Sequence, residues 1–320
     1  MELFLESFFV VGKALLRIFF LGLAGFFLSR FDWISEEGFD DVSKIVIYFT
    51  LPALIFSNFL GSSQLGDIRA WWVYPLGMAS LIGFGVILGL VVSYFLEWPE
   101  RRQFGALLGF PNTGYLPLAL AAALVGQVDQ ARAFQLIFLF TLGMVPNLWS
   151  TGIALISGKM VNAWQFVKNT FSSPPFIAIL ISIGMVIMGW EGYVPDLAID
   201  TASYAGDITV PLIMIVLGGM LARVDGEARS YPLAISLLVL IKLVIYPLVA
   251  LGGIFFFRPP ELLAFVLLVE AATPPATNLV VVGSHYGTDV DLLNQGLVYS
   301  YLASMITIPV FVSLLRLIYS

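Results

Sequence analysis

The sequence contains no cysteine and a single histidine, His285. Disulfide bonds and thiolate metal sites are therefore excluded, and one histidine alone cannot build a multi-histidine metal site. Without a cysteine pattern, the sequence does not indicate a redox compartment. We expect no cofactor, apart from Na⁺ as a candidate coupling ion.

Charge is also scarce, because only 11% of the 320 residues are charged, against about 25% in a soluble domain. Hydrophobic residues make up 59% of the chain, which excludes a disordered chain and indicates an integral membrane protein in a lipid bilayer. The net charge of −6 is spread over short connections, so we expect no nucleic-acid partner. The first apolar run is too long for a signal-peptide core and is predicted to be the first span.

Apolar runs long enough to cross a bilayer, at about 20 residues each, recur along the whole chain. They predict an all-α fold with ten transmembrane helices, at residues 3–28, 42–60, 71–96, 104–125, 133–156, 174–190, 207–222, 231–257, 262–282 and 293–318. The longest hydrophilic connection, residues 157–173, separates two five-helix units at residues 1–156 and 174–320.

Helix-perturbing prolines recur in the same order in the two units. Four landmarks of the first unit return in the second at offsets of 157 to 163 residues, namely Pro52 and Pro211, Pro75 and Pro232, Pro111 and Pro274, and Pro146 and Pro309. Because five spans is an odd number, the second copy enters the bilayer from the opposite face. This pattern predicts an inverted repeat, which is typical of secondary transporters.

Lysine and arginine near the span ends predict the orientation. One side carries eight basic residues, Arg30, Lys44, Arg101, Arg102, Lys159, Lys168, Arg223 and Arg229, and the other carries four, Arg69, Arg132, Arg258 and Arg316. Lys13 and Arg17 of the first span are interpreted as snorkelling to the near surface, and the ratio becomes eight to six if they are counted on the outer side. The more basic side is expected to be cytoplasmic, with both termini outside.

Two spans are interrupted near their midpoints by prolines and polar residues, at residues 109–117 and 270–278. Proline donates no backbone hydrogen bond and disfavours helix in the residue before it, so each span is predicted to be two half-helices that cross near mid-membrane. Asn112 or Thr113 is predicted to cap the first resumed helix. Thr273 is predicted to cap the second, with Pro274 or Pro275 at its first helical position.

Two helix N-termini that face each other attract an anion. The predicted substrate-binding residues are Asn112, Thr113, Gly114, Thr273, Pro274, Pro275, Thr277 and Asn278. The pattern favours a secondary transporter that carries a small organic anion by alternating access.

Two other function classes are alternatives to the carrier, namely a channel or uniporter and an intramembrane hydrolase. An anion channel would need rings of carbonyls or charges along an open pore, and a uniporter would share the carrier's fold. An intramembrane hydrolase finds only weak support, in Gly206-Asp207 and in Ser284-His285. Asp207 is interpreted as an exposed N-cap of the seventh span and His285 as a residue at the water boundary, so no enzyme is predicted.

Glu270 places a carboxylate near the centre of the ninth span, which costs about 2.5–3.5 kcal/mol on insertion scales. Three roles are open for it. It could bind a coupling Na⁺ together with Asn112 or Thr113, it could carry a proton, or it could form a structural ion pair with Lys242 of the eighth span.

Three segments resemble the auxin efflux carrier family, which includes bacterial malate-permease-type transporters and is similar to the bile acid/sodium symporters. They are KIVIYFTLPALIFS at residues 44–57, NTGYLPL at 112–118, and PPATN at 274–278 followed by YG at 286–287. The resemblance implies a ten-helix elevator-type carrier of carboxylates with two crossing helices, and a homodimer formed through its scaffold domain. It also implies that Asn112 contacts substrate and that Glu270 helps to hold sodium.

The large central loop of the plant carriers is missing here. A short central loop is typical of bacterial members of the family, so the bacterial inner membrane is the expected location.

Overall fold

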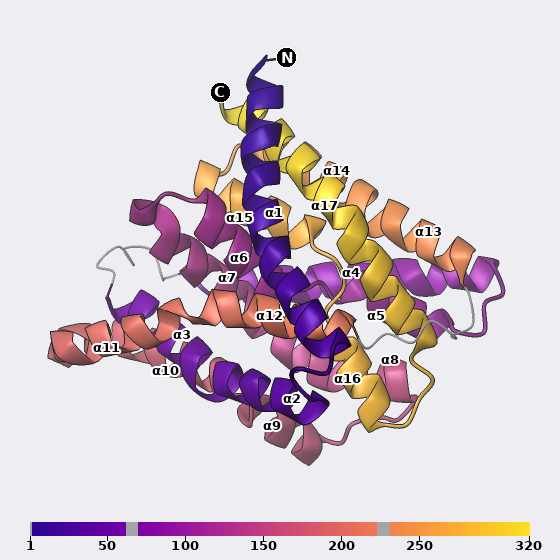
Figure 1. Ribbon diagram of the computed structural model, residues 1–320, viewed down its shortest axis with the longest axis horizontal. Helices are drawn as coiled ribbons and strands as arrows, with labels where there is room; N and C mark the ends of the chain where they lie inside the picture. The colour runs from indigo at the N-terminus through magenta and orange to yellow at the C-terminus, as the bar shows by residue number, and fades with distance from the viewer. Residues whose placement is uncertain (1, 62–69, 223–230) are drawn as a thin grey trace.

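The computed structural model describes residues 2–61, 70–222 and 231–320 (Figure 1). This part of the chain is 84% helical and contains no strand. An all-α fold is therefore confirmed. Arg69, Arg223 and Arg229, on which part of the orientation prediction depends, lie outside the described residues.

Seven helices in the described ranges are long and apolar enough to cross a membrane. They are α1 (Glu2–Arg30); α2 (Glu36–Ile45) with η1 (Val46–Thr50) and α3 (Leu51–Leu60); α4 (Val73–Phe95); α7 (Gln127–Asn147) with η3 (Leu148–Gly152) and α8 (Ile153–Ser157); α11 (Asp196–Asp207) with α12 (Thr209–Leu221); α13 (Pro232–Leu240) with η5 (Ile241–Ile245) and α14 (Tyr246–Phe257); and α17 (Asp291–Tyr319). The bent pair α9 (Ala163–Phe171) and α10 (Pro174–Ile187) makes an eighth if it counts as one span.

The remaining predicted spans are present as pairs of shorter helices. They are α5 (Arg101–Gly109) with α6 (Tyr115–Leu124), and α15 (Glu261–Ala272) with α16 (Asn278–His285). The prediction of ten spans depends on counting each pair as one interrupted crossing.

Two predicted segments differ from the structure. The hydrophilic connection at residues 157–173 lies between α8 and α10 as expected, but it contains a helix, α9, whose N-terminus is closed by a capping box between Asn162 and Gln165. The seventh span does not begin at Asp207, since α11 already begins at Asp196, after Pro195, and Asp207 is its last residue rather than an N-cap. In both places, acidic or amide side chains lower the hydropathy without preventing a helix. Only α9 starts at a favourable side-chain cap.

The helices pack in two groups. In one group α12 contacts α1 and α2, and α3 contacts α10 and α11. In the other, α4 contacts α5 and α7, α15 contacts α14 and α17, and α13 contacts α17. Figure 1 shows α3, α10 and α11 on one side of the molecule and α4, α5, α13 and α17 on the other.

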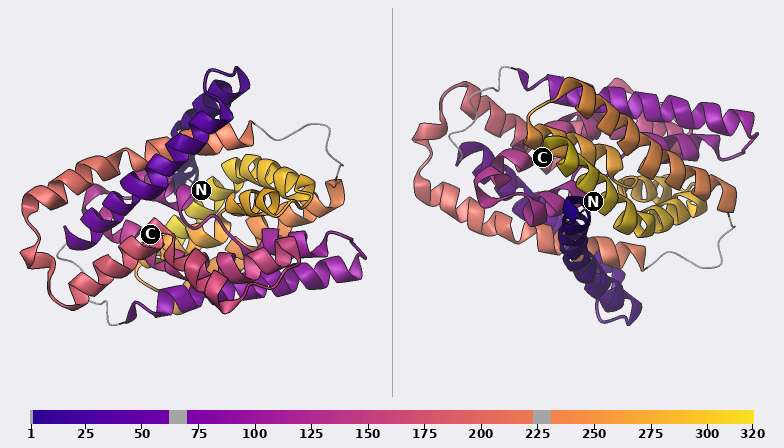
Figure 2. Two further views of the ribbon diagram at one scale, coloured as in Figure 1. Left: turned by 90° about the horizontal axis from the view of Figure 1, so that it is seen from below. Right: turned by 90° about the horizontal axis from the view of Figure 1, so that it is seen from above.

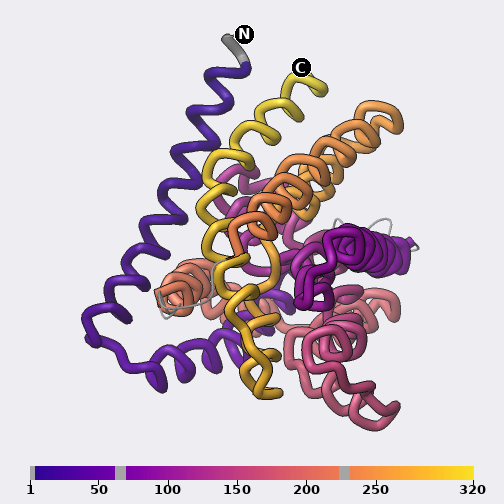
Figure 3. The backbone as a smooth tube through the Cα atoms, turned by 90° about the vertical axis from the view of Figure 1, so that its right-hand side faces the viewer, coloured from indigo at the N-terminus to yellow at the C-terminus, as the bar shows by residue number. Residues whose placement is uncertain are grey.

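The start of α1 and the end of α17 lie at the same end of the molecule (Figures 1 and 3). α1 and α2 form an outer edge, as Figure 2 shows from both sides. α1 reaches the second group through α17 and α6, so it contacts both groups.

Glycines allow the closest helix contacts. A Cβ at Gly218 of α12 would lie 1.7 Å from the carbonyl oxygen of Gly22 in α1. A Cβ at Gly89 of α4 would lie 2.7 Å from Cα of Gly105 in α5. Small residues at such crossings let backbones approach and gain van der Waals contact, which is the main source of attraction between helices in lipid.

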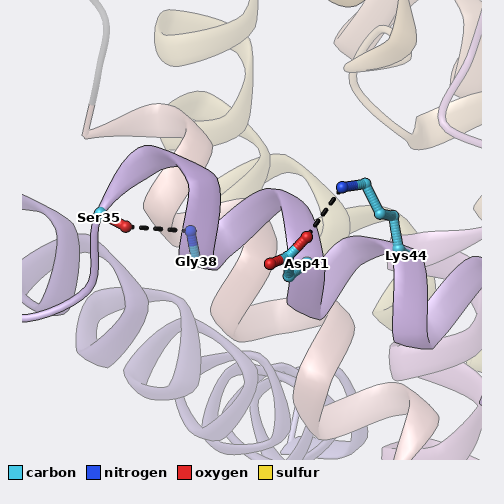
Figure 4. A network of polar contacts seen from close by, with 4 residues as sticks. All are labelled: Ser35, Gly38, Asp41 and Lys44. Carbon is cyan, nitrogen blue, oxygen red and sulfur yellow. Dashed lines mark hydrogen bonds and ion pairs between the residues drawn. The ribbon is translucent and has the colours of Figure 1, made fainter.

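The first turn of α2 explains why the second span begins where it does (Figure 4). The Ser35 hydroxyl oxygen accepts a hydrogen bond from the backbone N–H of Gly38 at 3.1 Å, which satisfies one of the free donors of a helix start. Lys44 forms an ion pair with Asp41 at 2.8 Å. Both side chains are exposed, so the cap matters more than the pair for the start of the helix.

Candidate functional site

The two interrupted helix pairs meet through their backbones. Pro111 and Pro275 form an isolated antiparallel bridge. In it, the backbone N–H of Asn112 donates to the carbonyl of Pro274 at 2.9 Å, and that of Ala276 donates to the carbonyl of Phe110 at 2.9 Å. Residues next to prolines supply these bonds because the prolines have no N–H of their own. The two breaks, 163 residues apart in the sequence, thus satisfy each other's buried backbone groups.

Thr273 does not cap the second resumed helix as predicted. It ends α15 in an extended conformation, and its hydroxyl donates to the carbonyl of Glu270 at 3.1 Å. α16 begins only at Asn278, after Thr277. The reason is that each of the consecutive prolines disfavours helix in the residue before it, so the chain stays extended until both have passed.

The first resumed helix, α6, has Gly114 at its N-cap position, so neither predicted N-cap, Asn112 or Thr113, is right. Asn112 still bonds to the start of this helix. Its side-chain oxygen accepts a hydrogen bond from the backbone N–H of Tyr115 at 3.0 Å. Its side-chain amide nitrogen donates to the hydroxyl of Tyr301 on α17. An N–H donor at Tyr115 requires an oxygen acceptor, so these two bonds fix the orientation of the amide.

A cavity of about 440 Å³ lies beside the two breaks. Of the predicted substrate residues it is lined by Asn112, Thr113, Gly114, Thr277 and Asn278. Thr273, Pro274 and Pro275 are not among its lining residues, and neither is Glu270.

The helix starts at Tyr115 and Asn278 both reach this cavity, as does the start of α10 at Pro174. No charged side chain lines the cavity among the described residues. These helix N-termini carry a partial positive charge. Few of their N–H groups are free, because Pro117, Pro174 and Pro175 have none and Asn112 accepts from that of Tyr115.

Glu270 and Lys242 lie away from this cavity and are both buried. Neither carboxylate oxygen of Glu270 has a hydrogen-bond partner in the described structure. The Lys242 ammonium donates to the carbonyl of Leu108, in the last turn of α5, at 3.1 Å. Lys242 and Glu270 form no hydrogen bond or ion pair in the described structure, although the elements that carry them, η5 and α15, pack against each other.

The sequence was compared with protein families and with known proteins. The family described as "Membrane transport protein" matches residues 10–312, nearly the whole chain. The chain belongs to this family, the auxin efflux carrier family. The resemblance inferred from the residues around the two breaks is thus confirmed.

Relatives in this family come from archaea and plants. An uncharacterized transporter, MJ1031, of Methanocaldococcus jannaschii is 26% identical over 299 residues, which cover 92% of this chain and 95% of the relative. Protein PIN-LIKES 5 of Arabidopsis thaliana is 21% identical over 381 residues, with 94% and 96% covered. Protein PIN-LIKES 3 of the same plant is 23% identical, with 96% of each chain covered. The protein is therefore an integral membrane transporter and not an enzyme.

In this member of the auxin efflux carrier family, several cavity residues were not predicted from the sequence. Tyr48 lies in the π turn η1 and Trp149 in the π turn η3. Three more lining residues, Asn169, Ser172 and Ser173, come from the connection at residues 157–173. The segment Ser173-Pro174-Pro175 has the same pattern as Thr273-Pro274-Pro275, a hydroxyl residue followed by two prolines. This similarity could have predicted from the sequence that the start of α10 also lies at the cavity.

Proposed function

We propose that this protein is a secondary active transporter for a small organic anion, in particular a carboxylate. The observation that carries the proposal is the cavity beside the two breaks, where helix N-termini meet and no charged side chain lines the wall among the described residues. A helix N-terminus offers backbone N–H groups and about half a positive charge, which suits a carboxylate. A volume of about 440 Å³ is in the usual range for small-ligand sites.

The lining supports an acid that also has an apolar part. Asn112, Thr113, Thr277 and Asn278 offer polar groups on one wall. The rest of the lining includes apolar side chains, namely Ile47, Leu51, Met144, Val145, Leu148, Val281 and Val282. An apolar wall with a few convergent polar groups fixes the orientation of a ligand through the polar groups.

Alternating access is proposed to arise from an inverted repeat of two five-helix units. The packing supports this, because contacts occur in pairs that the repeat relates: α1 with α12 and α3 with α10, and α4 with α5 and α14 with α15. The cavity has walls from both packing groups, with Leu51 and Pro174 on one side and Tyr115 and Met144 on the other. A movement of one group along the other, as in an elevator, would change the side from which the cavity is reached.

The remaining parts of the proposal concern the membrane and the assembly. With ten spans both termini lie on one side, which fits the common position of the α1 start and the α17 end (Figure 3). We place both termini outside a bacterial inner membrane, and we expect a homodimer through the group that contains α1, α3, α10 and α12. Of the two cations expected at Glu270, Na⁺ and H⁺, we propose H⁺ as the one to which transport is coupled, because the buried Lys242 on η5 already lies on an element that packs against α15.

Counterflow in proteoliposomes tests this function. Vesicles loaded with one acid from a panel of mono- and dicarboxylates should accumulate the labelled acid transiently, and uptake should saturate. A channel of the same fold would give uptake without transient accumulation above equilibrium. A uniporter would show counterflow but no accumulation driven by an ion gradient. Protein-free vesicles are the control, and absence of exchange with every acid would contradict the carboxylate substrate.

A further inference from the structure

Lys242 is one of two buried charged side chains among the described residues, and Glu270 is the other. It lies in the π turn η5, Ile241–Ile245, between α13 and α14. Pro247 follows two residues after this turn, and a proline commonly displaces the regular hydrogen bonds of the preceding turn. The π turn shifts the following face of the helix and is a frequent feature of functional sites.

The ammonium of Lys242 is held by two groups from two helices. It donates to the carbonyl of Leu108 on α5 at 3.1 Å, and it lies 4.8 Å from the ring centroid of Tyr246 on α14. It forms no ion pair with Glu270 on α15 within the described residues. η5 packs against α15, which places the two charges between the same helices. An aromatic face attracts a cation through its quadrupole, more strongly where water is excluded.

This environment has the chemistry of a cation site. α5 ends at Gly109 and α15 ends at Ala272, so the carbonyl-rich C-termini of both half-helices are near Leu108 and Glu270. A helix C-terminus carries about half a negative charge and free carbonyl oxygens. The two buried oxygens of Glu270, which accept no hydrogen bond in the described structure, add two further oxygen atoms that are free to bind a cation. Such oxygen groups suit a hard cation like Na⁺.

We infer that the tethered ammonium of Lys242 takes the place of a mobile coupling cation, so that the protein binds no Na⁺ at Glu270. Lys242 and Glu270 together are neutral, and a Na⁺ added to them would leave an uncompensated positive charge in a buried place. The inference rests on the proposed function only in its consequence, namely that transport does not depend on Na⁺.

The test measures thermal unfolding of the purified full-length protein in detergent, in NaCl and in choline chloride at equal ionic strength. A ligand that binds the folded state raises Tm with its concentration. The wild-type protein should unfold at the same Tm in both salts. Lys242→Gln should have a lower Tm in choline chloride and should recover it saturably with Na⁺, because the carboxylate and carbonyls are left without their cation.

Three further variants complete the design. Lys242→Ala repeats the test with more room for the ion and without an amide. Lys242→Gln combined with Glu270→Gln should lose the Na⁺ response, because the anionic ligand is gone. Lys13→Gln changes an exposed lysine of α1 and should behave like the wild type in both salts.

A saturable rise of the wild-type Tm with Na⁺ would overturn the inference, and this measurement does not depend on any variant folding. Folded Lys242 variants that show no response to Na⁺ would overturn it as well. Because no substrate is added, the result is separate from that of the counterflow test. The Na⁺ dependence of Tm can therefore be measured and interpreted even if the protein transports no carboxylate.

Discussion

The side-chain amide of Asn112, in the first break, donates to the hydroxyl of Tyr301 on α17 across 189 sequence positions. Asn112 lines the polar cavity beside the breaks. Tyr301 lines a second cavity of about 230 Å³, which is bounded mainly by apolar side chains of α1, α6, α12 and α17. This hydrogen bond thus joins a residue of the cavity beside the breaks to a residue of the second cavity, and both residues are buried.

Tyr301→Phe should weaken substrate binding without unfolding the protein. The phenyl ring keeps the packing, but the amide of Asn112 loses the partner that fixes its orientation. A buried neutral hydrogen bond contributes about 1 kcal/mol, so the half-saturation concentration in counterflow should rise about fivefold. Tyr299→Phe, on the exposed face of the same helix, is the matched control. Equal affinity in both variants would contradict a positioning role for Tyr301.

Asn112→Ala should abolish binding of the carboxylate while the protein stays folded. The variant removes the oxygen that accepts from the backbone N–H of Tyr115 at the start of α6, and an amide in the cavity wall. That hydrogen bond alone is worth about 1 kcal/mol of stability. Asn162→Ala removes a comparable hydrogen bond from the start of α9, away from the cavity lining. If both variants lost the same stability and Asn112→Ala kept its affinity for the carboxylate, the role of Asn112 would be limited to stabilising the start of α6.

Glu270 and Lys242 should depend on each other for stability. Removing one partner of a buried charge pair leaves the other charge unpaired and costs about 3–5 kcal/mol. Glu270→Gln and Lys242→Met should each lower the free energy of unfolding by this amount, and the double variant should lose clearly less than the sum. Denaturant unfolding in detergent measures the free energy of unfolding of each variant, and the exposed Glu261→Gln on α15 is the control. Additive losses would show that the two charges do not interact.

The sequence predicted the uninterrupted helices well, because apolar length and proline placement are local properties. The span predicted at residues 71–96 is α4, Val73–Phe95, and the last one, predicted at 293–318, is α17, Asp291–Tyr319. The start of α16 at Asn278 was missed, because Pro274 or Pro275 was predicted at the first helical position, whereas both prolines prolong the break.

The site could be predicted only in part, because many of its contacts are made by backbone groups or by residues of ordinary type. Asn112 and Glu270 were predicted as functional residues because a polar side chain in an apolar run is visible in the sequence. The carbonyl of Leu108, which accepts from Lys242, could not be foreseen, since every residue has the same backbone groups. Tyr301 was missed because a tyrosine in an apolar helix gives no sign of whether it faces lipid or a buried amide.

Gly218→Ala should destabilise the contact between α1 and α12. The added methyl group would lie 1.7 Å from the carbonyl oxygen of Gly22, so the helices must separate. Overpacking of this kind costs about 1–3 kcal/mol. Gly252→Ala, a helical position with no atom within 4 Å of the added Cβ, should be neutral or slightly stabilising. A Tm of Gly218→Ala equal to that of Gly252→Ala would contradict the close approach.

Replacing Pro274 and Pro275 together by alanine should stop transport. Both positions then gain an N–H and a preference for helix, so α15 can continue towards α16. The carbonyl of Pro274 would turn into the helix and release the backbone N–H of Asn112, which it binds at 2.9 Å. Hydrogen exchange should show lost protection at Asn112 and Ala276, together with loss of counterflow. Pro195→Ala, at the exposed start of α11, changes a proline outside the breaks and should keep both. Because the two breaks satisfy each other's backbone groups, wild-type transport with retained protection at Asn112 would mean that the prolines are not what keeps the second break open.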